Sequence, residues 1–357
     1  MFRGSFPDGV AYQRFLFVRQ LTLKGLHMSK RNTLALLASV TLALFSAPSL
    51  VSAQTVLKLG WTTSDSTSDP YAVGARLFKE EVERASDKKI TVQLYPNRQL
   101  GDEKQMLEGL RFGTVDVALV TNSVVAQLEP TFQLFDLPFL FSNAEEAYKV
   151  LDSEVGQAMS AKLEPKGIIN LGYTEGGFRQ MLNNKQPVNT PADVEGVKYR
   201  VMQNPMFIDM FSNLGGSAVP MAWGETFTAV QQGTIDGLEG ATSVFYASKF
   251  QEITKYLSLT NHNYSAVELL MSARSLKKLE PAQQAMIKEA AARTIAAQRE
   301  EAAKLALSSL EMMKKDGIQV NAIADVAPFR AAMSPLYDKA RGVVGDKLMD
   351  QTLSMVK

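Results

Sequence analysis

The chain has no cysteine and very little histidine. None of its 357 residues is Cys, and the two histidines are His27 and His262. Without cysteine there is no disulfide and no thiol chemistry. Once the N-terminal stretch that holds His27 is removed, as argued below, the lone His262 excludes any site that needs two histidines. We therefore expect neither a metal nor a cofactor.

Motifs of the common enzyme classes are missing as well. The sequence has no Walker A loop and no nucleophile-elbow pattern at a strand–helix joint. It also has no dinucleotide fingerprint, because the glycines at 172, 176 and 177 have the wrong spacing. A lone histidine is more often a hydrogen-bonded structural residue than a catalytic one. These absences predict a binding protein that is not an enzyme.

The longest apolar run lies near the N-terminus. Met28 opens a charged segment that ends at Arg31, an apolar run follows over 34–45, and small residues stand at Val51-Ser52-Ala53. This is the pattern of a secretory signal peptide, and the run is too short to span a bilayer comfortably. We expect Met28 to be the true start and cleavage to follow Ala53. Residues 1–27 would then be an upstream misreading of the start codon or an unusual extension.

Charge and length limit what the remaining chain can be. The full chain carries 38 Lys and Arg and 37 Asp and Glu, of which residues 1–53 hold six and one, so residues 54–357 have a formal charge of −4. A mildly acidic chain without basic blocks argues against nucleic acid as a partner. These 304 residues exceed what one hydrophobic core usually supports, so we expect two domains.

Strand and helix patterns alternate along the chain. We predict strands at 56–60, 90–95 and 115–120, with helices at 71–85 and 104–112. Asp69 and Pro70 form the N-cap and first position of the earlier helix. This βαβαβ order indicates an α/β fold with a largely parallel sheet. A late helix should run from Pro281 to about Lys315, roughly 50 Å, either as a brace that touches both lobes or as a coiled-coil interface.

Two joints in the sequence repeat each other. Gly113-Thr114-Val115-Asp116 and Gly233-Thr234-Ile235-Asp236 each follow a helical run. In both, the glycine can end the helix and the β-branched residue can start a strand. Chance is one explanation. We favour two lobes that are built on a similar plan, with a ligand cleft between them.

Arg200 stands in an alternating run that predicts a strand over 197–201. Val197, Tyr199 and Val201 would face a core, which leaves Lys198 and Arg200 on the other face. Open α/β sheets bind ligands at the C-terminal ends of their strands, and an arginine there can hold a carboxylate through two parallel hydrogen bonds. The alternative for Arg200 is a structural salt bridge.

Six segments carry a family resemblance. They read LYPNRQLGDEKQMLEGLRFGTVDVALV (94–120), LFDLPFLF (134–141), GFRQM (177–181), VEGVKYRV (194–201), PMAWGETFTAVQQGTIDG (220–237) and YLSLTNH (256–262). Together and in this order they resemble the solute-binding proteins of TRAP (tripartite ATP-independent periplasmic) transporters, of the C4-dicarboxylate-binding type. A periplasmic protein that serves a sensor and a secreted enzyme are the alternatives.

The resemblance implies a two-lobed periplasmic solute-binding fold. Each lobe would hold a mixed, mostly parallel sheet with flanking helices, and the long helix would span both lobes. We expect residues 54–176 with about 266–305 to form one lobe, and 177–265 with about 306–357 to form the other. The protein would be a periplasmic monomer that binds a small carboxylate and delivers it to the membrane subunits of a TRAP permease.

The resemblance also assigns ligand-binding positions. Arg200 matches the arginine that pairs with the substrate carboxylate, and Arg179 matches a second basic position near the ligand. Gln203 falls where a polar side chain often reaches the ligand, and Trp223 falls where an aromatic ring covers it. Thr121 and Asn122 would face the cleft from the first lobe.

Two departures from the family pattern leave the ligand open. Gly240 stands where many members have a carboxylate-binding asparagine, so Thr242, Ser243 or water must replace it. Asp69 stands where many members have a histidine. A carboxylate at position 69 would repel a second ligand carboxylate, unless Arg179 compensates. We expect either a one-carboxylate acid such as a sugar acid, with hydroxyls directed to Asp69, Thr121 and Thr242, or a C4-dicarboxylate.

Overall fold

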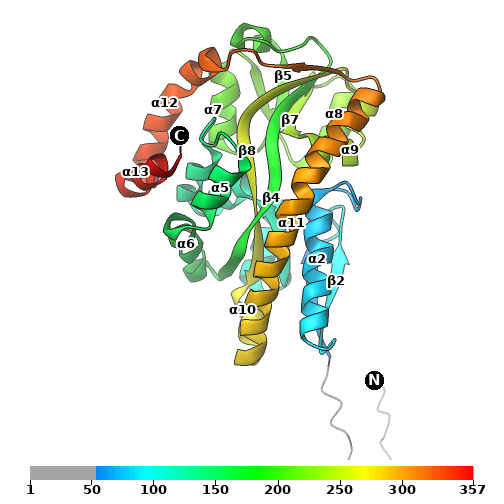
Figure 1. Cartoon of the computed structure of the whole chain (residues 1–357), viewed down its shortest axis with the longest axis vertical. Coiled ribbons are helices and arrows are strands. Elements are labelled where there is room, and N and C mark those ends of the chain that lie inside the picture. The colour runs from blue at the N-terminus through cyan, green and yellow to red at the C-terminus, as the bar shows by residue number, and fades with distance from the viewer. Residues whose placement is uncertain (1–53, 357) are drawn as a thin grey trace, which may run out of the picture. The chain divides into compact units, whose positions relative to one another are not determined.

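The computed structural model describes residues 54–356, so the predicted start at Met28 and the predicted cleavage after Ala53 lie outside the described residues. Residues 54–356 are built on a nine-stranded sheet in the order β2-β1-β3-β8-β4-β7-β5-β6, with β9 beside β8, and helices pack against it (Figure 1). Within this range no helix is both long enough and apolar enough to cross a membrane.

The half of the sheet around β1, here called the first lobe, follows the predicted βαβαβ order. Strand β1 (Thr55–Gly60) pairs in parallel with β2 (Ile90–Tyr95) and β3 (Val117–Thr121), and helices α2 (Pro70–Ala85) and α3 (Glu103–Phe112) connect them. Asp69 caps α2 and Pro70 begins it, as predicted. The chain continues through α4 (Asn122–Leu128), the 3-10 helix η1 (Pro130–Asp136), α5 (Ala144–Leu151) and α6 (Glu154–Ala161).

The half around β5, here called the second lobe, repeats this plan. Strand β5 (Lys198–Val201) pairs in parallel with β6 (Ser217–Pro220) and β7 (Gly237–Ala241), and the helices are α7 (Pro205–Asn213), α8 (Trp223–Gln231) and α9 (Thr242–Ala247). Val197, Tyr199 and Val201 are buried in the largest apolar cluster, as predicted for this strand.

The two repeated joints have the same local structure. Gly113 and Gly233 both adopt a positive φ, 78° and 69°, which glycine reaches without steric cost. Each following aspartate accepts a backbone hydrogen bond of 2.9 Å from the neighbouring strand, Asp116 from Lys58 and Asp236 from Lys198. The strands begin one residue after the aspartate, and not at the β-branched residue as predicted.

Two long antiparallel strands cross between the lobes. Strands β4 (Ile168–Asn183) and β8 (Tyr256–Ser272) pair with each other along most of their length (Figure 1). At one end β8 pairs with β3, and β4 pairs with β7 toward the other. Their register shifts between Asn170 and Tyr173, between Glu175 and Gly177, and between Arg179 and Met181. Gly177, at one of these shifts, has a φ of 104° that favours glycine.

The long helix α11 (Pro281–Lys315) follows the short α10 (Ala273–Lys277) and braces both lobes. It packs against α2 in the first lobe, against β4, and against α9 in the second lobe, so the brace that the sequence suggested is present (Figure 1). The chain ends with β9 (Gln319–Ala322), α12 (Ala327–Val344) and α13 (Asp346–Met355). Helix α12 contacts both η1 and α7, and the predicted lobe boundaries stay a prediction.

Candidate ligand-binding site

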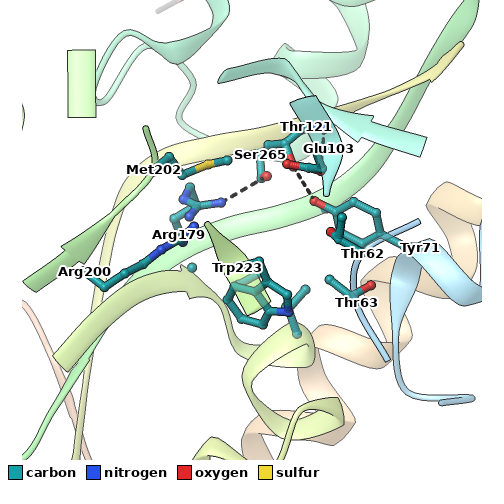
Figure 2. A pocket seen from close by; sticks show the side chains of 14 residues that line it. Thr62, Thr63, Tyr71, Glu103, Thr121, Arg179, Arg200, Met202, Trp223 and Ser265 are labelled. Carbon is teal, nitrogen blue, oxygen red and sulfur yellow. Dashed lines mark hydrogen bonds between the residues drawn. The ribbon is translucent and has the colours of Figure 1, made fainter. Parts of the chain in front are cut away.

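Two adjoining cavities lie where the lobes meet. The first cavity has a volume of about 40 Å³ and the second about 30 Å³, and both contact Thr62, Glu103, Arg200, Met202 and Trp223. The first cavity is further lined by Thr63, Tyr71, Thr121, Gly176, Arg179, Gly240, Ala241, Val244 and Ser265 (Figure 2). The second is further lined by Arg98, Asp102, Lys104, Val124, Gln127, Gln203, Met221 and Ala222. Residues of both lobes therefore line these two cavities, which are together called the cleft below.

Arg200 projects from the end of β5 into this cleft. Its side chain is 3% exposed, and its Nε and Nη2 donate to the Met221 carbonyl oxygen at 3.1 and 2.9 Å. Among residues 54–356 no carboxylate lies within the 4.0 Å that would make a salt bridge with it. Burial lowers the pKa of Arg200 to about 10, so the guanidinium stays charged at neutral pH. The structure therefore does not support the structural salt bridge, and it leaves a buried cation at the cavity wall.

Arg179 reaches the first cavity from β4, but a carboxylate already holds it. Its Nε donates to Glu239 Oε2, and its Nη2 donates to Glu239 Oε1 at 2.8 Å and to the Glu239 carbonyl at 3.1 Å. Burial alone would raise the pKa of Glu239, yet the Arg179 charge outweighs it and lowers that pKa to about 2. The two charges compensate each other. The remaining guanidinium nitrogen, Nη1, donates to Ser265 Oγ at 3.3 Å (Figure 2).

His262 lies behind this ion pair. Its Nε2 is 3.5 Å from Glu239 Oε2, and its Nδ1 is 2.7 Å from Thr260 Oγ1. Burial lowers the pKa of the imidazole, so the ring is neutral at physiological pH. His262 therefore supports Glu239 from a position that does not line either cavity, which is the structural role expected of a lone histidine.

Glu103, the first residue of α3, lines both cavities and was missed from the sequence. Its Oε1 accepts hydrogen bonds from Thr121 N at 2.9 Å and Thr121 Oγ1 at 2.7 Å, and Tyr71 OH lies 2.9 Å from the same Thr121 hydroxyl (Figure 2). Burial raises the pKa of this carboxyl. The available signal was the segment Gly101-Asp102-Glu103, which opens the helix between β2 and β3. Helix N-termini, however, are commonly acidic for helix stability alone.

Four further predicted residues line the cleft. Thr121 contacts the first cavity, Gln203 the second, and Trp223 both. The Trp223 ring also lies 5.6 Å from the Arg200 guanidinium carbon. Gly240 contacts the first cavity, and a Cβ atom there would lie 3.0 Å from the Phe245 ring and 3.7 Å from Arg179 Nη2. Because residue 240 has no side chain, the backbone of β7 lies close to the Arg179 guanidinium at this point.

Asp69, Asn122 and Thr242 line neither cavity, and their contact with a ligand stays a prediction. Asp69 is fully buried; its Oδ1 accepts from Thr63 Oγ1 and from the helix amides Tyr71 N and Ala72 N, and its Oδ2 accepts from Ser64 Oγ. Asn122 donates to the Phe132 carbonyl and to Asp136 Oδ1 in the core. Thr242, the first residue of α9, is buried beside the cavity lining.

No group of three or more His, Cys, Asp or Glu in the described part of the chain could hold a metal ion. The chemistry that the site offers is a buried guanidinium, a buried carboxyl, several hydroxyls and an aromatic ring. That set can hold a small organic anion.

Comparison with known proteins agrees with this set of groups. The profile of the family described as bacterial extracellular solute-binding protein, family 7, matches residues 62–342. The 2,3-diketo-L-gulonate-binding periplasmic protein YiaO of Escherichia coli K12 is 34% identical over 303 residues, which cover 83% of this chain and 92% of YiaO.

Solved structures are similar over the same region. A TRAP periplasmic solute-binding protein of Polaromonas sp. JS666, bound to D-erythronate, has a TM-score of 0.81 and 36% identity and covers 84% of this chain and 98% of its own. A TRAP periplasmic solute-binding protein of Sulfurospirillum deleyianum, with bound succinate, has a TM-score of 0.80 and 29% identity and covers 85% and 99%. These relatives share the two-lobed fold, and the ligands they hold include a hydroxylated monocarboxylate and a dicarboxylate.

Proposed function

The chain belongs to family 7 of the bacterial extracellular solute-binding proteins, and from this premise we propose that Arg200 holds the carboxylate of a small organic acid in the cleft. It is a solute-binding protein of the TRAP type. Its partner would be the membrane permease of that transporter, to which the closed, loaded protein delivers its ligand.

The buried, unpaired charge of Arg200 is the observation that carries this proposal. An isolated buried charge is unfavourable, and a carbonyl oxygen supplies only part of the compensation that a carboxylate would give. A ligand carboxylate in the first cavity would complete the ion pair. The Trp223 ring lies beside the guanidinium and would cover the apolar part of the ligand.

Replacement of Arg200 by alanine tests the assignment. Removing one partner of a buried charge pair costs about 3–5 kcal/mol, so affinity should fall on the order of several hundredfold or more. A thermal-shift panel of carboxylates and sugar acids would first identify a ligand, and calorimetry on Arg200→Ala would measure the loss. Arg341→Ala, which removes a surface guanidinium far along the chain on α12, is the control. Affinity within tenfold of the parent would remove Arg200 from the site.

We also propose that export to the periplasm ends with cleavage after Ala53. The signal-peptide pattern of residues 28–53 supports this, and family 7 proteins act outside the cytoplasm. N-terminal sequencing of the exported protein should give Gln54 as the first residue. A mature protein that keeps residues 1–27 would contradict both the start and the cleavage site.

A further inference from the structure

We propose that the ligand is a monocarboxylic acid with several hydroxyl groups, and that Glu103 selects it against dicarboxylates. This inference rests on the proposed function, because it assumes that Arg200 holds one carboxylate. The relatives leave the question open, since both D-erythronate and succinate are found in similar structures. The side chains of this cleft decide it.

Arg179 is a weaker receptor for a ligand carboxylate than Arg200. Glu239 binds it through both carboxylate oxygens and through its own carbonyl, and both side chains are buried. A ligand carboxylate could bind Arg179 through two parallel hydrogen bonds only by displacing Glu239, which would leave that carboxylate buried without a partner. Otherwise it reaches only Nη1, on a guanidinium whose charge Glu239 already compensates. Of the two arginines that line the first cavity, only Arg200 has no carboxylate partner among residues 54–356.

Glu103 opposes a second negative charge and suits a hydroxyl. Its Oε1 is occupied by Thr121, whereas none of the residues in the described range donates a hydrogen bond to its Oε2. The side chain lines both cavities, so a ligand that extends from Arg200 passes it. A ligand hydroxyl can donate to this carboxylate, while a ligand carboxylate 4 Å away would lose about a thousandfold in affinity at an effective dielectric of 20.

Five side chains with hydroxyl groups also line the first cavity, together with the apolar Met202, Trp223, Ala241 and Val244. The five are Thr62, Thr63, Tyr71, Thr121 and Ser265 (Figure 2). Thr63 and Thr121 already donate to Asp69 and Glu103, so toward a ligand their oxygens can accept hydrogen bonds. Such a lining can hydrogen-bond the hydroxyls of a polyhydroxy chain. The second cavity does contain Arg98 and Lys104, next to Asp102 and Glu103, so a long diacid that passes Glu103 is the competing ligand.

Calorimetry with four probes at pH 8 tests the inference: D-erythronate, D-gluconate, succinate and galactarate. The parent protein should bind at least one of the two aldonates about a hundredfold or more tighter than either diacid. Glu103→Gln keeps the size of the side chain and removes its charge. We expect it to weaken aldonate binding about tenfold or more and to narrow the ratio between aldonate and succinate. Glu108→Gln, on the same helix but paired with Arg111 away from the cleft, is the matched control and should change neither value.

The outcomes separate the inference from the function beneath it. If a diacid binds the parent as tightly as the aldonates, the proposed ligand class is wrong and the proposed function stands. An unchanged aldonate-to-succinate ratio in a folded Glu103→Gln protein would show that Glu103 does not select. If the folded parent binds none of the four acids and none in a wider carboxylate panel, the proposed function itself fails, and the inference falls with it.

Discussion

At the scale of single residues, two arginines in one cavity have opposite roles. Arg179 pairs with Ala241 across β4 and β7, which places Glu239 two residues along the facing strand, within reach on the same face. Arg200 has no such carboxylate opposite it. The difference comes from cross-strand register. The sequence therefore identified both arginines as basic positions near a ligand, but it did not reveal that one of them is paired with a buried carboxylate.

Asp69 shows the same limit in a different way. The sequence marked it as an N-cap and also as a ligand-binding carboxylate; the structure shows the N-cap and places the carboxyl outside both cavities. Both of its oxygens accept hydrogen bonds from local hydroxyl or amide groups. Glu103, which was not predicted, is the buried acid that lines both cavities.

Asp69→Asn should change the pH dependence of stability and leave ligand binding intact. Burial raises the pKa of Asp69 from 3.8 to about 7 in the folded protein. The stability that it contributes is therefore full below pH 3.8 and is lost as the pH rises through about 7. Asparagine keeps the cap and cannot titrate. As Asp69 ionises, the free energy of unfolding of the parent should fall by up to about 1.4 kcal/mol per pH unit, and the variant should lack this slope.

Melting curves of parent and variant from pH 5 to pH 8 would measure this difference. The variant should be at least as stable as the parent at pH 8, where the parent must hold a buried charge. Parallel pH profiles would show that Asp69 is not protonated in the folded state. A large loss of ligand affinity would return Asp69 to the binding site.

At the scale of elements, a side chain of α11 hydrogen-bonds the backbone of β4 at a break in its strand pairing. Where the register of β4 and β8 shifts between Glu175 and Gly177, the buried Gln298 amide takes over the role of a neighbouring strand. Its Oε1 accepts from Glu175 N at 2.8 Å, and its Nε2 donates to the Glu175 carbonyl at 2.8 Å and to the Pro70 carbonyl at 3.2 Å. One side chain thus ties the long helix to the crossing strand and to the start of α2, next to Gly176 and Tyr71 of the first cavity.

Gln298→Leu should therefore destabilise the protein by about 2–5 kcal/mol, because it leaves the Glu175 amide and carbonyl buried without partners. Thr294→Val is the matched control: Thr294 lies one turn earlier on α11, is equally buried, and its hydroxyl has no partner among the described residues. That isosteric change should be nearly neutral. Urea unfolding of both variants measures the difference, and equal effects would mean that Gln298 contributes only by packing.

At the scale of the whole molecule, hydrogen bonds join the two lobes directly, as in a closed form. Gln127 of the first lobe donates to the Gln203 carbonyl of the second at 2.8 Å, and Asn204 donates back to the Ser123 carbonyl at 2.8 Å. These bonds cross the cleft beside the two cavities. A two-lobed binding protein that opens to admit its ligand must break them, and the ligand shifts the population toward the closed form.

The absence of cysteine makes this closure measurable. Gln99→Cys and Glu225→Cys would place one spin label on each lobe, at exposed positions near the second cavity. A saturating ligand should shift the distribution of label distances toward shorter values. A pair within the first lobe, Lys88→Cys with Gln99→Cys, should not respond. Identical distributions with and without ligand in the cross-lobe pair would argue against opening and closing.

Much of this architecture could be predicted from the sequence because it is local. The cap at Asp69, the glycine joints at Gly113 and Gly233 and the uninterrupted run of α11 each have a short-range cause. The crossing of β4 and β8 could not be derived from local pattern, since their register shifts obscure the alternation and their partners lie up to about a hundred residues away. The identity of the charged groups at the cleft depends on that same long-range pairing.

A crystal structure of the purified protein with its tightest-binding hydroxy acid would test the central claim most directly. The account predicts the ligand carboxylate on the Arg200 guanidinium, a ligand hydroxyl on Glu103, the Trp223 ring over the carbon chain, and the Arg179–Glu239 pair intact. A carboxylate bound to Arg179 with Glu239 displaced, or a ligand that does not touch Arg200, would contradict it.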